Sequence, residues 1–329
     1  MDDAALKSIW EAPFETAPTL RDIEAAAQRI RGHARRTPLL NAPLLDAEAG
    51  RRVWVKAECL QLTGSFKFRG AFATISGMPE AERARGVLAF SSGNHAQGMA
   101  HAAALHGIPC VIVMPHDAPA VKIERTRAYG AEVVLYRRGE EDRDAVGAAL
   151  AGERGLTLVK PFDDGRVMAG QGTCGLEIGE DLPEGVSEVL VCCGGGGLTA
   201  GTALALEGRA TVRPAEPDGY DDVARSLTSG RIERNETEVG GLCDAILTPA
   251  PGALPFAAMR RLCGPGAVVT EAEALRAMAA AWRHLRIVLE PGGAVALAAA
   301  LYREGPDCVA VASGGNVDRA TFERALAEG

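Results

Sequence analysis

Short apolar runs alternate with longer stretches of helical period along almost the whole chain. Because the runs lie between helices and are apolar on both faces, they are typical of parallel strands covered on both sides. Strands are expected at about residues 53–57, 86–90, 109–114, 132–135, 156–159, 188–193, 210–215 and 308–312. The pattern predicts an α/β protein.

The stretches between these runs predict the helices. They are expected at about residues 19–31, 66–75, 96–106, 120–129, 143–153, 167–179, 198–206, 254–262, 271–285, 293–302 and 319–327. Thr19 and Asp22 suggest a capping box for the first helix. The elements of residues 83–160 form a self-contained block, so we expect a small domain there. It would be inserted into a large domain of residues 1–82 and 161–329.

Composition argues against several classes of protein. The chain has 329 residues and a net charge of −8, which argues against a nucleic-acid partner. No apolar stretch reaches the length of a membrane span, and Met1-Asp2-Asp3 lacks the features of a secretory signal. The eight cysteines include no CxxC pair, so neither a zinc site nor a disulfide framework is indicated. A cytoplasmic protein with buried thiols is expected.

A lysine stands at the start of the helix expected after the first strand, in Ser65-Phe66-Lys67. Ser65 is the candidate N-cap. Since a helix N-terminus carries partial positive charge, the pKa of Lys67 is expected to fall there. A neutral lysine amine is a nucleophile for carbonyl compounds, pyridoxal phosphate (PLP) among them. The alternative is that Lys67 extends to solvent.

Two further segments suit an anion. Ser91-Ser92-Gly93-Asn94-His95 lies between an expected strand and a helix, although an ordinary capped turn would explain the same residues. Gly194, Gly195, Gly196 and Gly197 precede Leu198 in a similar place, where glycines let the backbone approach a phosphate. The glycine stretch also fits a relaxed dinucleotide fingerprint, with Glu216 as the ribose-binding acid.

A last segment, Ser313-Gly314-Gly315-Asn316, follows the final expected strand. A glycine turn into the last helix accounts for it. In a ligand site, Ser313 would instead place a neutral hydroxyl at the carboxyl edge of the sheet, where open α/β sheets bind ligands.

These segments, with Glu290-Pro291-Gly292-Gly293-Ala294, occur in an order and spacing that resemble the fold-type II PLP enzymes. Within them, the chain is most similar to the threonine/serine dehydratases and serine racemases. The resemblance covers nearly the whole chain. It implies a tryptophan synthase β-like fold, with two three-layer α/β domains and open, mostly parallel sheets, and it implies a homodimer.

The resemblance also implies roles. Lys67 would hold PLP covalently and then remove the Cα proton, and Ser92 would act on the opposite face of Cα or on the leaving hydroxide. Ser313 would face the pyridine nitrogen, where a neutral hydroxyl favours β-elimination over transamination. The implied PLP-binding residues are Phe66, Lys67, Asn94, Gly194, Gly195, Gly196, Gly197, Leu198, Glu290, Ser313 and Asn316.

Substrate and metal residues follow from the same resemblance. The implied substrate residues are Ser91, Ser92, Asn94, His95 and Arg143. His95 as a neighbour of the helix cap and Arg143 as a surface charge are the alternatives. Glu216, Asp222 and the Tyr220 carbonyl resemble a divalent-cation site for Mg²⁺, Ca²⁺ or Mn²⁺. The alternative there is a helix N-terminus with acids near its dipole.

The implied activity is an ammonia-lyase that converts L-threonine to 2-oxobutanoate, or L-serine to pyruvate. A 3-hydroxyaspartate dehydratase, with Arg143 as a contact for the second carboxylate, and a serine racemase are alternatives on the same fold. An NAD-dependent oxidoreductase leaves Lys67 unexplained, and a PLP-fold protein without turnover leaves Ser92 and Ser313 unexplained. The chain ends soon after Asn316, so isoleucine control through a regulatory domain is not expected. Residues 239–244 depart from the family pattern, which leaves the substrate preference open.

Overall fold

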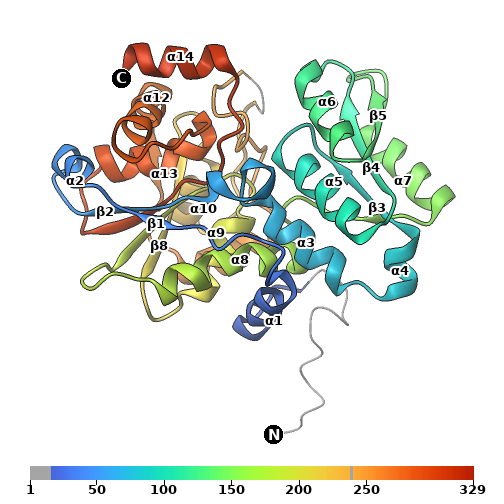
Figure 1. Ribbon diagram of the computed structural model, residues 1–329, viewed down its shortest axis with the longest axis horizontal. Helices are drawn as coiled ribbons and strands as arrows, with labels where there is room; N and C mark the ends of the chain where they lie inside the picture. The colour runs from blue at the N-terminus through green and yellow to red at the C-terminus, as the bar shows by residue number, and fades with distance from the viewer. Residues whose placement is uncertain (1–15, 238–239) are drawn as a thin grey trace, which may run out of the picture.

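The computed structural model describes residues 16–237 and 240–329 (Figure 1). It contains two separate β-sheets, each flanked by helices, with the six-stranded sheet in one lobe and the four-stranded sheet in the other. Within these residues, all strand pairings are parallel except that of β1 with β2. The predicted α/β class with mostly parallel sheets is confirmed.

The larger sheet has the strand order β1-β2-β10-β7-β8-β9. Its strands are β1 (Leu39–Leu40), β2 (Val53–Lys56), β10 (Cys308–Val311), β7 (Glu188–Cys192), β8 (Thr211–Pro217) and β9 (Ala267–Val269). The helices of this lobe are α1 (Leu20–Ile30), α2 (Pro43–Ala49), α3 (Lys67–Gly77), α8 (Gly165–Glu180), α9 (Gly197–Ala205), α10 (Asp222–Ser229), α11 (Ala253–Leu262), α12 (Glu271–Ala280), α13 (Pro291–Tyr302) and α14 (Arg319–Glu328).

The alternation of side chains along β7 explains the layers of this lobe. Val189 and Val191 pack into a cluster with residues of α8 and α9. Leu190 and Cys192 pack on the opposite face, with residues of α13. The strand is therefore apolar on both faces, as a buried parallel strand must be.

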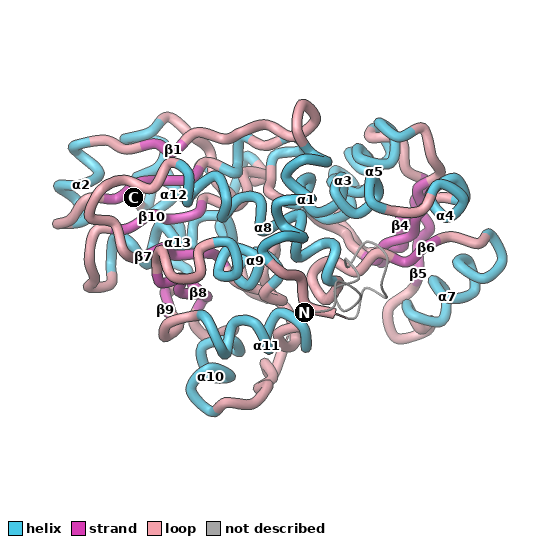
Figure 2. Tube along the Cα trace, turned by 90° about the horizontal axis from the view of Figure 1, so that it is seen from below, coloured by secondary structure: helices cyan, strands magenta, loops and turns pink. Residues whose placement is uncertain are grey.

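The smaller sheet has the order β5-β4-β3-β6, and all its strands lie within the block expected to form the small domain. Its strands are β3 (Val87–Phe90), β4 (Cys110–Pro115), β5 (Glu132–Tyr136) and β6 (Thr157–Leu158), and its helices are α4 (Glu80–Arg85), α5 (Asn94–His106), α6 (Ala120–Ala128) and α7 (Arg143–Arg154). Figure 2 shows this lobe beside the larger one, with α3 and α5 between the two sheets. The boundaries at residues 82 and 161 remain predictions.

The predicted cap of the lysine helix is wrong. Ser65 is extended, with φ −161° and ψ 161°, and Phe66 occupies the N-cap position without a side-chain hydrogen bond. The physical reason is that Ser65 forms a β-bridge with Gly314, which draws its backbone away from the helix. The capping box of α1, formed by Thr19 and Asp22, is confirmed.

Short elements escaped the sequence pattern. Helices α2, α4 and α10 have seven, six and eight residues, and β9 has three, which is too few for a clear period. The helix predicted over residues 271–285 is divided, because α12 ends at Ala280 and a π-helical turn continues to Leu285.

Three further expectations concerned membrane spans, the cysteines and the chain termini and loops. Among the described helices, none is long and apolar enough to cross a bilayer. Each cysteine is a free thiol, and only Cys263 is not fully buried. Met1, Asp2, Asp3 and Val239, which carried expectations above, lie outside the described residues.

Candidate active site

Lys67 is the first residue of α3, and its backbone is held by the turn that follows β10. The Phe66 N–H donates to the carbonyl oxygen of Ser313 at 3.1 Å. The Lys67 Nζ donates to the carbonyl oxygen of Pro161 at 2.9 Å. Burial lowers the pKa of Lys67 to about 8. The pKa is lowered as expected, and the cause is burial of the amine.

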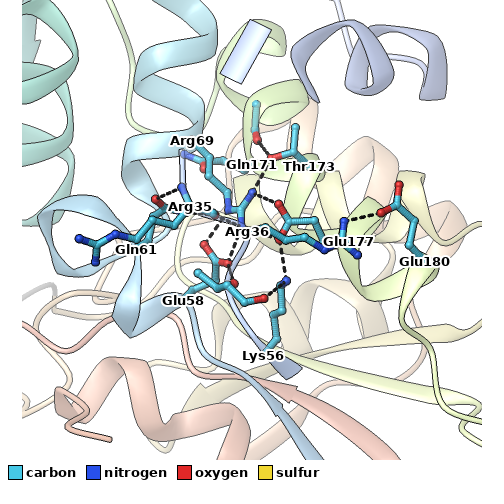
Figure 3. A network of polar contacts seen from close by, with 12 residues as sticks. Arg35, Arg36, Lys56, Glu58, Gln61, Arg69, Gln171, Thr173, Glu177 and Glu180 are labelled. Carbon is cyan, nitrogen blue, oxygen red and sulfur yellow. Dashed lines mark hydrogen bonds and ion pairs between the residues drawn. The ribbon is translucent and has the colours of Figure 1, made fainter. Parts of the chain in front are cut away.

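A buried ion-pair network fixes the first turn of α3 (Figure 3). Arg69 donates to both carboxylate oxygens of Glu58, at 2.7 and 2.8 Å, and to both of Glu177, at 2.7 and 2.8 Å. Lys56 Nζ donates to Glu177 at 2.6 Å. Burial opposes the charge of Arg69, but the two carboxylates outweigh it and raise its pKa well above the usual value. The network ties α3 to β2 and α8.

The glycine loop joins β7 to α9 and fits only glycine. A Cβ at Gly195 would lie 2.3 Å from the Phe162 ring, and Gly196 has φ +90°. The first-turn N–H groups of α9 have no partners within the helix, so they face outward as donors. A backbone this crowded by its neighbours and this rich in N–H groups fits a phosphate.

The turn after β3 approaches Lys67 from the smaller sheet. A Cβ at Gly98 of α5 would lie 3.1 Å from the carbonyl carbon of Lys67, so α5 packs directly on the lysine backbone. Ser91 and Ser92 are half-buried, and the Gly93 N–H donates to Ser91 Oγ at 3.1 Å. These hydroxyls and the N-terminus of α5 are suited to a carboxylate.

His95 is 2% exposed, and its Nε2 lies 3.2 Å from the carbonyl oxygen of Val159. Burial first, and the charge of Lys67 second, lower the pKa of His95 to about 3. A neutral ring that donates through Nε2 keeps only an acceptor at Nδ1, which has no partner among the described residues. The side chain therefore cannot donate to a carboxylate, whereas the His95 backbone N–H at the start of α5 can.

Asn94 joins the two lobes at the site. Its Nδ2 donates to Glu290 Oε1 at 2.6 Å, and its Oδ1 accepts from Asn316 Nδ2 at 2.7 Å. Asn316 Nδ2 also donates to the carbonyl oxygen of Thr63 at 2.8 Å. Burial raises the pKa of Glu290 to about 7, and the Asn94 amide partly offsets this. The structure thus brings Asn94, Glu290 and Asn316 together beside the lysine turn.

Arg143 lies apart from these residues. Its side chain is 51% exposed, its Nε donates to Asp144 Oδ1 at 3.3 Å, and its guanidinium lies 5.2 Å from the centroid of the Phe90 ring. Phe90 precedes Ser91, so Arg143 is on the substrate side of the small lobe but makes no described contact with the other site residues.

Glu216 and Asp222 lie at the end of β8 and the start of α10. The Glu216 carboxylate accepts from the N–H groups of Val223 and Ala224, at 2.9 and 2.7 Å, so it is not free to bind a ribose. Burial and the nearby Asp222 raise the pKa of Glu216 well above its usual value.

The Asp222 carboxylate has fewer hydrogen-bond partners than its buried oxygens could accept. Burial raises the pKa of Asp222 to about 6, and its Oδ2 has no hydrogen-bond partner among the described residues. No described cluster has three or more His, Cys, Asp or Glu side chains placed for a metal. Two buried carboxylates with one unpartnered oxygen nevertheless fit a hard cation that is completed by a backbone carbonyl and water.

Two parts of the site were missed in the sequence. The first is the segment after β6, where Pro161 accepts from Lys67 and the Asp163 carboxylate accepts from the Leu254 N–H at 2.9 Å. The second is an ion pair between Lys122 and Asp244, at 2.5 Å. Neither has a local sequence signal, because each depends on a partner far away in the chain.

Comparisons with known proteins agree with this geometry. Residues 30–314 match the family described as "Pyridoxal-phosphate dependent enzyme". The L-threo-3-hydroxyaspartate ammonia-lyase of Pseudomonas sp is 42% identical over 304 residues, which cover 90% of this chain and 95% of that protein. The serine racemase of Dictyostelium discoideum is 37% identical over 318 residues, covering 94% and 98%.

A solved structure extends the similarity to the fold. The T.th. threonine deaminase superposes with a TM-score of 0.85 at 42% identity, covering 92% of this chain and 99% of that one. The resemblance drawn from the ordered segments around Lys67 is confirmed. The chain belongs to the pyridoxal-phosphate-dependent enzyme family and has the fold of its fold-type II members.

Proposed function

We propose that the protein is a PLP-dependent ammonia-lyase for a β-hydroxy amino acid, L-threonine or L-serine. The observation that supports this most strongly is the buried amine of Lys67, with a pKa of about 8, where the turns after β2, β3 and β10 meet. Lys67, Asn94, Ser313 and the glycine loop at residues 194–197 would hold PLP. Bound there, PLP would supply the electron sink for the bond broken at Cα.

The chain's own groups would move the protons. The Lys67 amine would take the Cα proton, since a base works best with a pKa near the operating pH. Ser92 would donate a proton to the departing hydroxide. The Cα–H and Cβ–O bonds break, and water leaves. The resulting enamine becomes an imine and takes up one water, which gives ammonia and the 2-oxo acid, so no oxidant or reductant is needed.

Borohydride reduction tests the role of Lys67. We expect the PLP-loaded protein to yield a reduced pyridoxyl group on residue 67, found by peptide mass spectrometry, and to release ammonia from threonine. Lys67→Ala should lose both, with activity reduced about a thousandfold or more. A wild-type protein that carries the adduct on another residue would overturn the proposal.

A second candidate activity is 3-hydroxyaspartate ammonia-lyase, which the 42% identity to the Pseudomonas protein favours. A serine racemase is the third, from the Dictyostelium relative. Steady-state rates with threonine, serine and both 3-hydroxyaspartate diastereomers, together with chiral analysis of residual serine, would distinguish the three.

We also propose Mg²⁺, or Ca²⁺ or Mn²⁺, at Glu216, Asp222 and the Tyr220 carbonyl. The unpartnered Asp222 Oδ2 supports it. We further propose that the protein is a homodimer, which sedimentation tests, and that it is cytoplasmic, which cell fractionation tests. We also propose that residues 83–160 form a domain separate from the remainder, which limited proteolysis tests.

A further inference from the structure

An ion pair crosses from the smaller to the larger lobe near the site. Lys122, in the first turn of α6, donates to Asp244 Oδ2 at 2.5 Å. The Lys122 side chain is 29% exposed and that of Asp244 is 57% exposed, so both reach water. Arg69 and Glu58, in contrast, are closed to solvent.

The fold places this pair beside the substrate turn. Strands β3 and β4 are parallel neighbours, so the turn that holds Ser91 and the turn leading to α6 lie at the same edge of the smaller sheet. From the larger lobe, the backbone next to Asp244 reaches the glycine loop, since a Cβ at Gly194 would lie 2.6 Å from the Ile246 carbonyl oxygen.

Both charges act on the pKa of Glu290, a buried residue of the site. Asp244 raises this pKa and Lys122 lowers it. Glu290 in turn bonds Asn94, three residues after Ser91. The Lys122 ammonium therefore acts on a residue that is bonded to the segment where the carboxylate of the substrate would bind.

We propose that Lys122 is the specificity-determining cation that receives the second carboxylate of a dicarboxylic β-hydroxy amino acid, such as 3-hydroxyaspartate, in exchange for Asp244. The inference rests on the proposed ammonia-lyase function. A lysine suits the exchange, because its ammonium is a point charge on a flexible stem and can change partners. Asp244 loses little when released, because it is already more than half exposed to water. With a monocarboxylic substrate, Lys122 stays paired with Asp244, and the two charges cancel.

Arg143, the contact that the sequence suggested, is less well placed for this role. It is on α7, where it lies over Phe90 and pairs with its neighbour Asp144. It has no counterpart on the larger lobe among the described contacts.

The test is the ratio of kcat/KM for L-threo-3-hydroxyaspartate to kcat/KM for L-threonine, measured on the PLP-loaded protein. Lys122→Met should lower this ratio about ten- to hundredfold, the effect of a lost charge-assisted hydrogen bond. Asp244→Asn should raise it, because the competing anion is removed. Arg127→Met, which removes an exposed cation from the same helix, should leave the ratio unchanged.

The directions in which the two variants move the kcat/KM ratio distinguish substrate recognition by Lys122 from a pair that only holds the lobes together. If Lys122→Met and Asp244→Asn move the ratio in the same direction, the pair only ties the lobes together and the inference is wrong. Lys122→Arg keeps the charge and should keep most of the ratio, which controls for misfolding. A wild type that deaminates threonine but not hydroxyaspartate overturns the inference and leaves the proposed function intact. A wild type inactive on threonine, serine and hydroxyaspartate overturns both.

Discussion

The two sides of the site are built in different ways. On the side of the larger sheet, the turns that carry Lys67 and Ser313 are joined by backbone hydrogen bonds, and Ser65, Arg69 and Ser313 are buried. On the side of the smaller sheet, Ser91 and Ser92 are half-buried. The polar contacts from Asn94 and Lys122 to the larger side are made by their side chains.

The different construction of the two sides suits them to different roles. Side-chain bonds at a partly exposed edge can be exchanged at little cost, whereas a buried backbone pairing cannot. The larger side is therefore suited to hold the cofactor in one geometry, and the smaller side to admit, recognise and release substrates. Changes on the larger side should alter stability and PLP affinity, and changes at Ser91 and Ser92 on the smaller side should alter KM.

The largest effect is expected from Arg69→Met. It leaves Glu58 and Glu177 as buried carboxylates short of a cation, which costs about 3–5 kcal/mol of unfolding free energy. Urea unfolding of the PLP-free protein measures the loss. Arg319→Met, which breaks an exposed pair, is the control and should not move the midpoint measurably. A loss no greater than the control's would mean that the network does not hold the larger side.

Gly195→Ala tests the larger side as the cofactor cradle. The new Cβ would lie 2.3 Å from the Phe162 ring, and overpacking of this kind should weaken PLP binding about ten- to hundredfold. Equilibrium titration of the apoprotein with PLP gives the Kd. Gly152→Ala, in open space on α7, is the matched control. Unchanged PLP affinity in Gly195→Ala would refute the cradle.

The carboxylate pair at Glu216 and Asp222 gives a pH-dependent test on the larger side. The pKa of Asp222 is raised to about 6, so without a cation its contribution to stability is present at low pH and lost as pH rises through that value. A bound cation stabilises the ionised form. Mg²⁺ should therefore add more to the unfolding free energy at pH 8 than at pH 5, by on the order of 1–2 kcal/mol.

Thermal unfolding at both pH values, with EDTA or Mg²⁺, measures this difference. Asp222→Asn should abolish the pH-dependent gain. An equal gain in that variant would place the cation elsewhere.

The smallest effect is expected from Ser91→Ala on the smaller side. It removes the hydroxyl that accepts from the Gly93 N–H, so the turn loses one hydrogen bond. We expect KM for threonine to rise about two- to tenfold, with the Kd for PLP unchanged. A loss of PLP affinity similar to that of Gly195→Ala would erase the distinction between the two sides.

Much of this arrangement could be predicted from local patterns. The apolar runs indicated the strands, and a strand followed by glycines or hydroxyls marked each candidate ligand turn, because parallel strands end at a shared edge. The Lys67, Ser91, Gly194 and Ser313 segments were all found this way. Their exact partners were not, and Ser65 was given a helical cap when its backbone pairs with Gly314.

What escaped the sequence depends on long-range pairing. The Arg69 carboxylate partners lie 11 and 108 residues away, and Lys122 meets Asp244 across 122 residues. No window of the length that shows periodicity contains both ends of the two longer contacts. The same charges, considered locally, fit exposed helix surfaces equally well.

The β-bridge between Ser65 and Gly314 also constrains how the enzyme can be made. The early segment that carries Lys67 cannot form this pairing until residue 314 has been translated. A nascent chain stalled before β10 would therefore lack the pairing that holds the lysine segment in place.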